Sequence, residues 1–303
     1  MPLPPLSPEQ LVKPRYFELR IAAIFAALFV PIAIHLPYFP LWLETNGFDA
    51  QQIAIILSVP MFLRVVTTPF VTAWADNVGD RANVLILLVA ASLVFSLGFF
   101  LQPTYLVVMA VSVLLTLAWT PHSPLTDSLA LSGVRRFGVN YTGMRIWGSI
   151  AFLLSNLFGG IILSRTGAHF VPVLITASLC FTLVAALFAP RLGRPRRPSP
   201  LSATEIQLDG PKLLNRYFVL FVAGAGIINA SHAFLFGFVS IYWKSIGLSD
   251  TMIGVLWAWA VVAEAVMFAL FNRLFAHRPP TSVLALAGVA AMIRWLMYPL
   301  IGP

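Results

Sequence analysis

Five charged side chains lie inside stretches of the sequence that are otherwise apolar enough to enter a lipid bilayer: Arg64, Asp127, Arg145, Glu264 and Arg294. An ionised group near the centre of a bilayer costs about 2.5–3.5 kcal/mol on insertion scales, so such a residue usually has a partner or a task. A carboxylate in this setting can take up and release protons, and an arginine can bind a carboxylate through two parallel hydrogen bonds. These residues are the first candidates for a functional site.

The composition indicates an integral membrane protein. Hydrophobic residues make up 59% of the 303 residues and charged residues only 10%, whereas a soluble domain has about 25% charged residues. Nine segments are long enough to span a bilayer, at about 20 residues each, and they are predicted to be helices because no water can satisfy their backbone groups. The predicted spans lie near 16–43, 50–73, 83–101, 105–131, 141–164, 169–190, 215–245, 250–274 and 281–301.

The distribution of Lys and Arg predicts the orientation of the chain. If the N-terminus is cytoplasmic, the inner loops hold fourteen Lys and Arg residues and the outer loops hold two, Arg165 and Lys244. This bias follows the positive-inside rule. It predicts a multi-pass protein of the plasma membrane, which we expect to be a bacterial inner membrane. The last residues of this chain are then expected to lie outside the cytoplasm. The basic residues are spread over five loops, so the net charge of +8 does not indicate a nucleic-acid partner, which requires a clustered basic surface.

The most polar stretch of the sequence divides it into two parts. Residues 191–211 contain the run RPRRPSP and are predicted to be a flexible cytoplasmic linker. They separate a six-helix half, residues 1–190, from three helices in residues 212–303. A shift of 200 residues aligns the turns around Gly47 and Gly247 and places Arg64 on Glu264. We therefore expect a duplicated six-plus-six bundle that lacks its last three helices, either as a fragment or as a chain that needs a complementing C-terminal segment.

Several short motifs resemble the phenylpropionic acid permease group of the major facilitator superfamily. They are PLTDSL at 124–129, YTGMRIWGS at 141–149, IYW at 241–243, VVAEA at 261–265 and FNRLF at 271–275. The resemblance implies an all-α bundle of the major facilitator type that binds its substrate near mid-membrane between the two repeats. Residues 76–81 resemble the superfamily's cytoplasmic loop between the second and third helices. Asp76, Gly79 and Arg81 are therefore expected to form a conformational-switch loop.

A more distant resemblance to the oligosaccharide:proton symporters, the group that includes lactose permease, implies roles for the buried charges. A carboxylate late in the fourth helix and an arginine early in the fifth, here Asp127 and Arg145, would contact substrate. A glutamate in the eighth helix and an arginine in the ninth, here Glu264 and Arg294, would take part in proton coupling. The tenth-helix residues that complete the coupling set in that group have no counterpart in this sequence.

The residues themselves leave alternatives open for each of these roles. With a cytoplasmic turn at residues 133–140, Asp127 and Arg145 would lie at similar depth in adjacent helices, as a structural salt bridge or as a pair that opens for substrate. Glu264 could cycle a proton or stay paired with Arg294 or Arg64. Weaker candidates for substrate binding or cavity lining are His232, Trp147, Trp119, Tyr242, Trp257, Trp259, His35 and His122. His122 is also predicted to mark a break in the fourth helix.

The leading prediction is proton-coupled uptake of a small organic solute by alternating access. Three intramembrane arginines less two carboxylates leave an excess charge of +1, which an aromatic carboxylate such as 3-phenylpropionate would cancel. The proton gradient would supply the energy, with no organic cofactor and no metal, and the partners would be the substrate, protons and lipid. The alternatives are proton-driven efflux of amphipathic compounds and a truncated membrane protein without transport. Sequence motifs of metalloproteases, serine hydrolases and P-loop enzymes are absent.

Overall fold

The structure, a computed structural model, describes residues 12–78, 80–193, 216–275 and 278–297, and every regular element in these ranges is a helix. In chain order they are α2 (Phe17–Thr45), α3 (Ala50–Asn77), α4 (Arg81–Ser96), η1 (Leu97–Phe100), α5 (Tyr105–Trp119), α6 (His122–Phe137), α7 (Tyr141–Thr166), η2 (Ala168–Phe170), α8 (Val171–Leu187), α9 (Arg216–Ser245), α10 (Asp250–Phe275) and α11 (Pro280–Met297). Seven helical segments of the described ranges are long and apolar enough to cross a membrane. The all-helical prediction is confirmed, whereas the count of nine spans stays a prediction.

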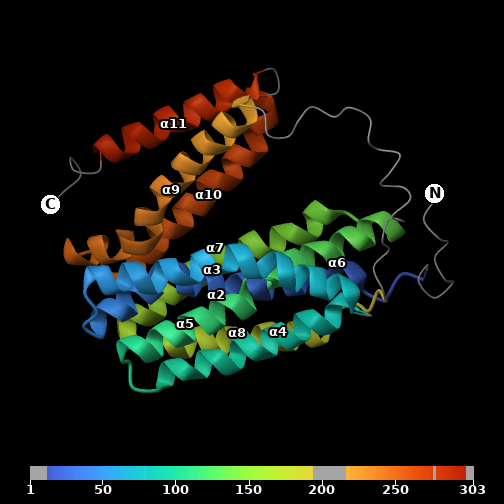
Figure 1. The fold of residues 1–303 in the computed structure, drawn as a ribbon, viewed down its shortest axis with the longest axis horizontal. Helices are drawn as coiled ribbons and strands as arrows, with labels where there is room; N and C mark the ends of the chain where they lie inside the picture. Colours follow the sequence, from blue (N-terminus) through green and yellow to red (C-terminus); the bar gives the residue numbers. More distant parts are fainter. Residues whose placement is uncertain (1–11, 79, 194–215, 276–277, 298–303) are drawn as a thin grey trace.

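The helices form two groups that meet at one end and separate toward the other (Figure 1). Helices α2–α8 pack together as an N-terminal bundle, α9 and α10 contact α2 and α7, and α11 contacts α9. We call the end that holds turns 46–49 and 246–249 the closed end, and the end where α8 finishes and α9 begins the open end. Val239 of α9 and Ile253 of α10 are fully buried near the closed end, whereas residues 216–223 of α9 are exposed at the open end. The two groups therefore pack through their closed-end halves.

The two closed-end turns have the same geometry, 200 residues apart. Gly47 and Gly247 have φ angles of 84° and 91°, in the left-handed region that glycine adopts without Cβ strain. The amide of each glycine donates to the carbonyl three residues earlier, at 2.9 Å to Glu44 and 3.0 Å to Lys244. The helices that flank the turns correspond as well, because α2 and α9 end, and α3 and α10 begin, at positions that differ by 200.

Close contact between α7 and α10 seals the closed end. A Cβ at Gly160 would lie 2.5 Å from the carbonyl oxygen of Asp250, and a Cβ at Gly254 would lie 2.6 Å from the carbonyl oxygen of Asn156. Because real Cβ contacts are longer than this, only glycine permits the two helices to approach so closely. The Tyr38 hydroxyl of α2 donates to the Asn156 carbonyl at 2.9 Å. Three helices from the two groups are thus joined at one point.

The predicted fourth span consists of two helices. Helix α5 ends at Trp119 and α6 begins at His122, and Pro121 between them cannot continue the hydrogen-bond ladder. The predicted break near His122 is confirmed. Helix α6 then continues to Phe137 and stops at Gly138, whose φ is 67°. The turn to α7 therefore covers residues 138–140, and the prediction of a longer turn at 133–140 is wrong.

The residues that follow α8 are held against the N-terminal bundle. The amide of Gly193 donates to Asp80 Oδ2 at 3.1 Å, and Arg136 Nη1 donates to the carbonyl of Leu192 at 2.7 Å. The predicted linker, residues 191–211, thus begins on the surface of this bundle. Residues 194–211 lie outside the described residues, and the division into parts 1–190 and 212–303 stays a prediction.

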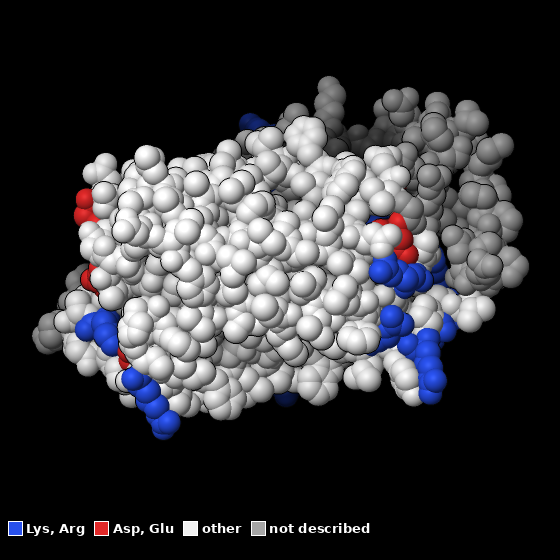
Figure 2. Space-filling view, turned by 90° about the horizontal axis from the view of Figure 1, so that it is seen from below, with Lys and Arg blue, Asp and Glu red and all other residues white. Residues whose placement is uncertain are grey.

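One broad face of the molecule carries no Lys, Arg, Asp or Glu between two ends where charged side chains gather (Figure 2). Large apolar side chains are exposed on several helices of the N-terminal bundle, including Leu87, Val94, Leu106, Leu114, Phe181 and Val184. Soluble monomers rarely expose contiguous apolar patches beyond a few hundred Å². Such a face suits the hydrocarbon core of a bilayer, and the chain is a multi-pass membrane protein.

Candidate functional site

The five intramembrane charged residues form no salt bridges with one another. The salt bridges in the part of the chain that the structure describes lie beside helix ends and involve other residues: Lys13–Glu18, Arg81–Asp76 and Lys244–Asp250. The direct Asp127–Arg145 ion pair that the sequence suggested is absent, and so is a Glu264–Arg294 pair.

Asp127 and Arg145 are linked through a tyrosine. The side chain of Asn140 accepts a hydrogen bond from the Gly143 amide at 3.2 Å and so starts α7 at Tyr141. The Tyr141 hydroxyl donates to Asp127 Oδ1 at 2.9 Å, and the same hydroxyl interacts with the side chain of Arg145. The Arg145 guanidinium also lies over a ring of α2, that of Phe29, at 4.3 Å. The arrangement is a half-buried polar bridge between α6 and α7.

The length of α6 explains why the two charges do not meet directly. Asp127 lies ten residues before the end of α6, or about 15 Å along its axis, while Arg145 lies four residues into α7, or about 6 Å. The two side chains are therefore at different depths, and Tyr141 bridges the difference. The sequence analysis missed Tyr141. Its position one helical turn before Arg145 was the available signal, since residues four apart share a helix face.

Trp147 does not join this cluster. Its side chain is 52% exposed, and at two residues from Arg145 it lies on nearly the opposite side of α7. Of the other aromatic candidates, Trp257 is buried and donates its indole N–H to Ser240 Oγ at 3.1 Å, and Trp259 is exposed.

His232 and Arg294 are brought together from α9 and α11. His232 Nδ1 lies 2.9 Å from the carbonyl oxygen of Ile228, so Nδ1 carries the proton and donates. Nε2 then accepts from Arg294 Nη1 at 3.0 Å. A weaker contact of 3.4 Å joins Arg294 Nη2 to Ser231 Oγ. The imidazole is neutral in this arrangement, because a second proton would remove the acceptor that the guanidinium uses.

Glu264 is exposed and makes no hydrogen bond or salt bridge with any other described residue. It lies seven residues after Trp257, two helical turns, and so on the same face of α10. Trp257 stacks on Phe236 of α9 at 6.0 Å between ring centroids. The face of α10 that carries Glu264 is therefore directed toward α9. Glu264 lies nearer the open end than Trp257, where the other helices no longer bury this face.

Arg64 lines a cavity of about 380 Å³ inside the N-terminal bundle, between α2, α3, α5 and α6. His35, Trp119 and His122 also line this cavity. Arg64 has no hydrogen-bond or ion-pair partner within the described ranges. It lies in the N-terminal bundle and Glu264 in α10, so these two repeat-related residues do not pair.

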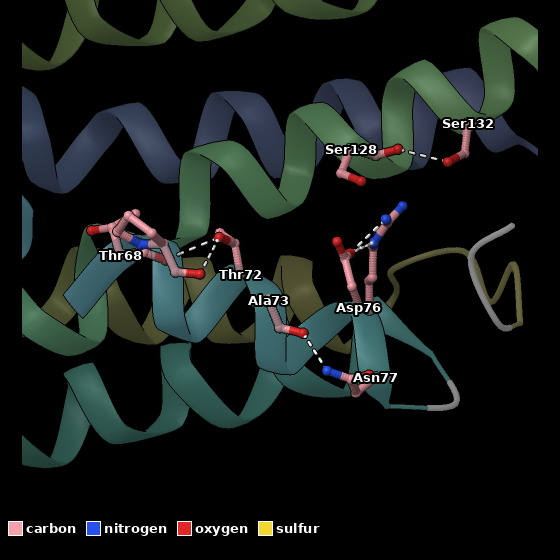
Figure 3. Close-up of polar contacts among 9 residues, drawn as sticks. Thr68, Thr72, Ala73, Asp76, Asn77, Ser128 and Ser132 are labelled. Carbon is pink, nitrogen blue, oxygen red and sulfur yellow. Dashed lines mark hydrogen bonds and ion pairs between the residues drawn. The ribbon is translucent and has the colours of Figure 1, made fainter. Parts of the chain in front are cut away.

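The predicted switch loop is partly visible. Asp76 Oδ1 accepts hydrogen bonds from Arg81 Nε and Nη2 at 2.8 and 2.6 Å, across the turn from α3 to α4. Figure 3 shows Asp76 beside the part of α6 that carries Ser128 and Ser132, and α3 and α6 contact each other. Gly79 lies outside the described residues.

Comparison with known proteins places this geometry in a family. Residues 18–302 match the MFS_1 like family. The chain belongs to this family of the major facilitator superfamily. It is 26% identical over 277 residues to the "Probable 3-phenylpropionic acid transporter" of Escherichia coli K12, which covers 91% of this chain and 72% of that protein. It is 27% identical over 285 residues to the maltose permease of Geobacillus stearothermophilus, covering 93% and 69%.

Solved structures share the fold at lower sequence identity. The nucleoside transporter NupG matches with a TM-score of 0.66 and 13% identity, over 86% of this chain and 68% of that one. A bacterial homologue of the human lysosomal transporter Spinster, inward-facing and unoccupied, matches with a TM-score of 0.65 and 15% identity, over 91% and 65%. The predicted relation to major facilitator permeases is confirmed. The chain is a transporter of the secondary type and not an enzyme.

Proposed function

We propose that this transporter carries out proton-coupled uptake of a small organic solute, with an aromatic carboxylate such as 3-phenylpropionate as the favoured class. The observation that carries the proposal is the absence of salt bridges among the five intramembrane charges of the described chain. Three arginines and two carboxylates leave an excess of +1, which a bound carboxylate cancels. The name of the Escherichia coli relative, a probable 3-phenylpropionic acid transporter, supports the same class.

The open end is proposed to face the cytoplasm of a bacterial inner membrane. Among the described residues, Arg165 and Lys244 lie at the closed end, whereas most other basic residues lie at or near the open end, including Arg15, Arg20, Arg81, Arg135, Arg136 and Arg216. The positive-inside rule then makes this an inward-open state. Transport requires a second state in which the open end closes and the contact of α7 with α10 separates.

We assign proton coupling to Glu264, Arg294 and Arg64, and the contact of His232 with Arg294 supports adding His232 to this group. Because neutral His232 accepts from Arg294, a proton on Nε2 would replace the acceptor with a donor and place two positive charges in contact. Protonation would therefore release Arg294 from α9. His232 was a substrate-binding candidate on sequence grounds, and its contact with Arg294 favours the coupling role.

Replacing His232 with glutamine tests this role. Glutamine keeps an acceptor for Arg294 and cannot be protonated, so we expect the uptake rate to fall about 100-fold, the lower end of the range for a lost proton-transfer group. We also expect the uptake rate to depend less on pH in this variant than in the wild type. The measurement is the initial uptake rate in proteoliposomes at a series of external pH values. Ser231→Ala, which removes only the 3.4 Å contact, is the control, and an unchanged pH profile in His232→Gln would contradict the role.

The direct test of the proposed function is uptake of labelled 3-phenylpropionate into proteoliposomes with an alkaline interior. The neutral acid crosses lipid unaided, so the rate in protein-free vesicles is subtracted. We expect saturable uptake that disappears without the pH gradient. Uptake of maltose or a nucleoside without any response to organic acids would contradict a carboxylate as the substrate class. Transport only out of the vesicles would favour efflux. The absence of any flux would indicate a chain that does not transport alone, and restoration by a separately expressed C-terminal segment would identify that partner.

A further inference from the structure

The cavity in the N-terminal bundle holds polar groups that no protein partner satisfies. His122 is 1% exposed and Ser112 is 4% exposed, and both line the cavity. Ser92 Oγ lies 3.3 Å from His122 Nε2, but His122 Nδ1 and Ser112 Oγ have no hydrogen-bond partner among the described residues. Arg64 on the same cavity is unpaired as well. Because buried polar atoms are almost always hydrogen-bonded, the two buried atoms without partners, on a cavity that the exposed Arg64 also lines, point to a ligand.

The polar and apolar residues that line the cavity lie at different depths along the helix axes. On α3 the lining runs from Ile56 at the closed-end side to Arg64, eight residues or about 12 Å further on. His122 begins α6 and lies toward the open end from α5, so it belongs to the same side as Arg64. Phe39, nearer the closed end of α2, belongs to the other side. The cavity therefore has a cationic side and an aromatic side.

The aromatic side is built from stacked rings. His35 stacks on Phe39 at 4.5 Å between centroids and meets Trp119 edge-on at 5.3 Å. Aliphatic side chains complete the wall, namely Leu28, Ile32, Leu36, Ile56, Leu57 and Met61. A volume of about 380 Å³ is within the usual range for sites of small organic ligands, which are mostly apolar with a few placed polar groups.

We propose that this cavity is the binding site of the transported solute and that its ligand is a monocarboxylate with a flat apolar body. Arg64 binds the carboxylate, His122 supplies a further hydrogen bond, and the ring of the ligand packs against Trp119 and His35. The inference rests on the proposed function, because the ligand is taken to be the transported solute. It gives Arg64 a substrate-binding role in place of proton coupling, and it places the substrate in a different location from Asp127, Arg145 and Trp147, none of which line the cavity.

The proposal is tested by comparing how each residue substitution changes the binding of two ligands, one with a carboxylate and one without. Binding of 3-phenylpropionate and of its neutral analogue 3-phenylpropan-1-ol is measured on the purified chain by equilibrium dialysis. Arg64→Gln is expected to weaken binding of the acid about 10- to 100-fold, as for loss of a charged hydrogen bond, and to leave binding of the alcohol unchanged. Trp119→Leu is expected to weaken both ligands. The matched control is Arg165→Gln, an exposed position at the closed end, which should change neither.

A thiol-protection experiment locates the ligand without removing Arg64. The single cysteine, Cys180, is replaced by serine, and Thr116 on the cavity wall is replaced by cysteine. We expect 3-phenylpropionate to slow the reaction of this cysteine with a maleimide. Leu114→Cys on the same helix, 200° away and 45% exposed, should show no protection.

The outcomes separate this inference from the proposed function. Loss of acid binding in Arg145→Gln but not in Arg64→Gln, or no protection at Thr116→Cys, moves the substrate out of this cavity and leaves uptake of organic acids intact. If Arg64→Gln weakens binding of the acid and of the alcohol equally, Arg64 does not contact the carboxylate. A wild-type chain that binds no organic acid overturns both proposals.

Discussion

Replacing Glu264 with glutamine is expected to abolish proton-driven accumulation. A coupled proton and a pH difference of one unit support about a tenfold accumulation of solute, because a factor of ten corresponds to about 1.4 kcal/mol. With a difference of two units the wild-type chain should therefore accumulate solute about 100-fold for each coupled proton. Glutamine mimics the protonated carboxyl and cannot release a proton, so the initial rate of accumulation in the variant should equal the rate in protein-free vesicles, which the neutral acid enters unaided. Exchange of internal for external solute, which needs no net proton release, should continue.

Glu44→Gln is the matched control for this experiment. Glu44 is exposed in the last turn of α2 at the closed end, so the same loss of charge there should leave accumulation unchanged. Accumulation by Glu264→Gln at the wild-type level would assign proton coupling to other groups, with His232 and Asp127 as the next candidates.

The sequence predicts helices and their order well, because apolar runs of sufficient length have one solution in a bilayer. It predicts helix ends less well, and two glycines near the end of α6 show why. Gly133 was taken as the helix terminator, yet it lies within α6, and a Cβ there would overlap the ring of Phe17 from α2. Gly138 is the residue with the positive φ that ends the helix. Gly133 allows close packing against α2, whereas Gly138 forms the turn. Only the contact of Gly133 with Phe17 distinguishes the two roles.

The candidate site shows the same limit. The residue types that matter were visible as charges in apolar spans, but their partners were not. Arg294 and His232 are 62 residues apart in sequence, and nothing in the local pattern brings α11 to this part of α9. Resemblance to other symporters assigned Arg294 to proton coupling, whereas the residues alone suggested substrate binding for His232. The hydrogen bond between them favours one shared role.

Replacing Gly254 with leucine is expected to prevent the closed end from sealing. Any Cβ at this position would lie 2.6 Å from both the Asn156 carbonyl oxygen and the Tyr38 hydroxyl, and the backbone of α7 cannot turn aside as a flexible side chain can. Overpacking of this kind costs about 1–3 kcal/mol, which shifts an equilibrium between two states about 5- to 150-fold. Uptake should fall by a similar factor, and Gly254→Ala should fall between leucine and the wild type.

A reporter at the closed end distinguishes opening from misfolding. Val239→Cys in a chain without Cys180 places a thiol at a fully buried position of α9, which should react with a membrane-impermeant maleimide faster when Gly254→Leu is also present. Gly226→Leu is the control, because a Cβ at Gly226 on the same helix as the reporter meets no atom within 4 Å. If both leucine variants transport equally and Val239→Cys reacts no faster, the contact of α7 with α10 does not control access. If Gly254→Leu alone loses transport and exposes the thiol, the glycine contact is the element that separates the two states of the carrier.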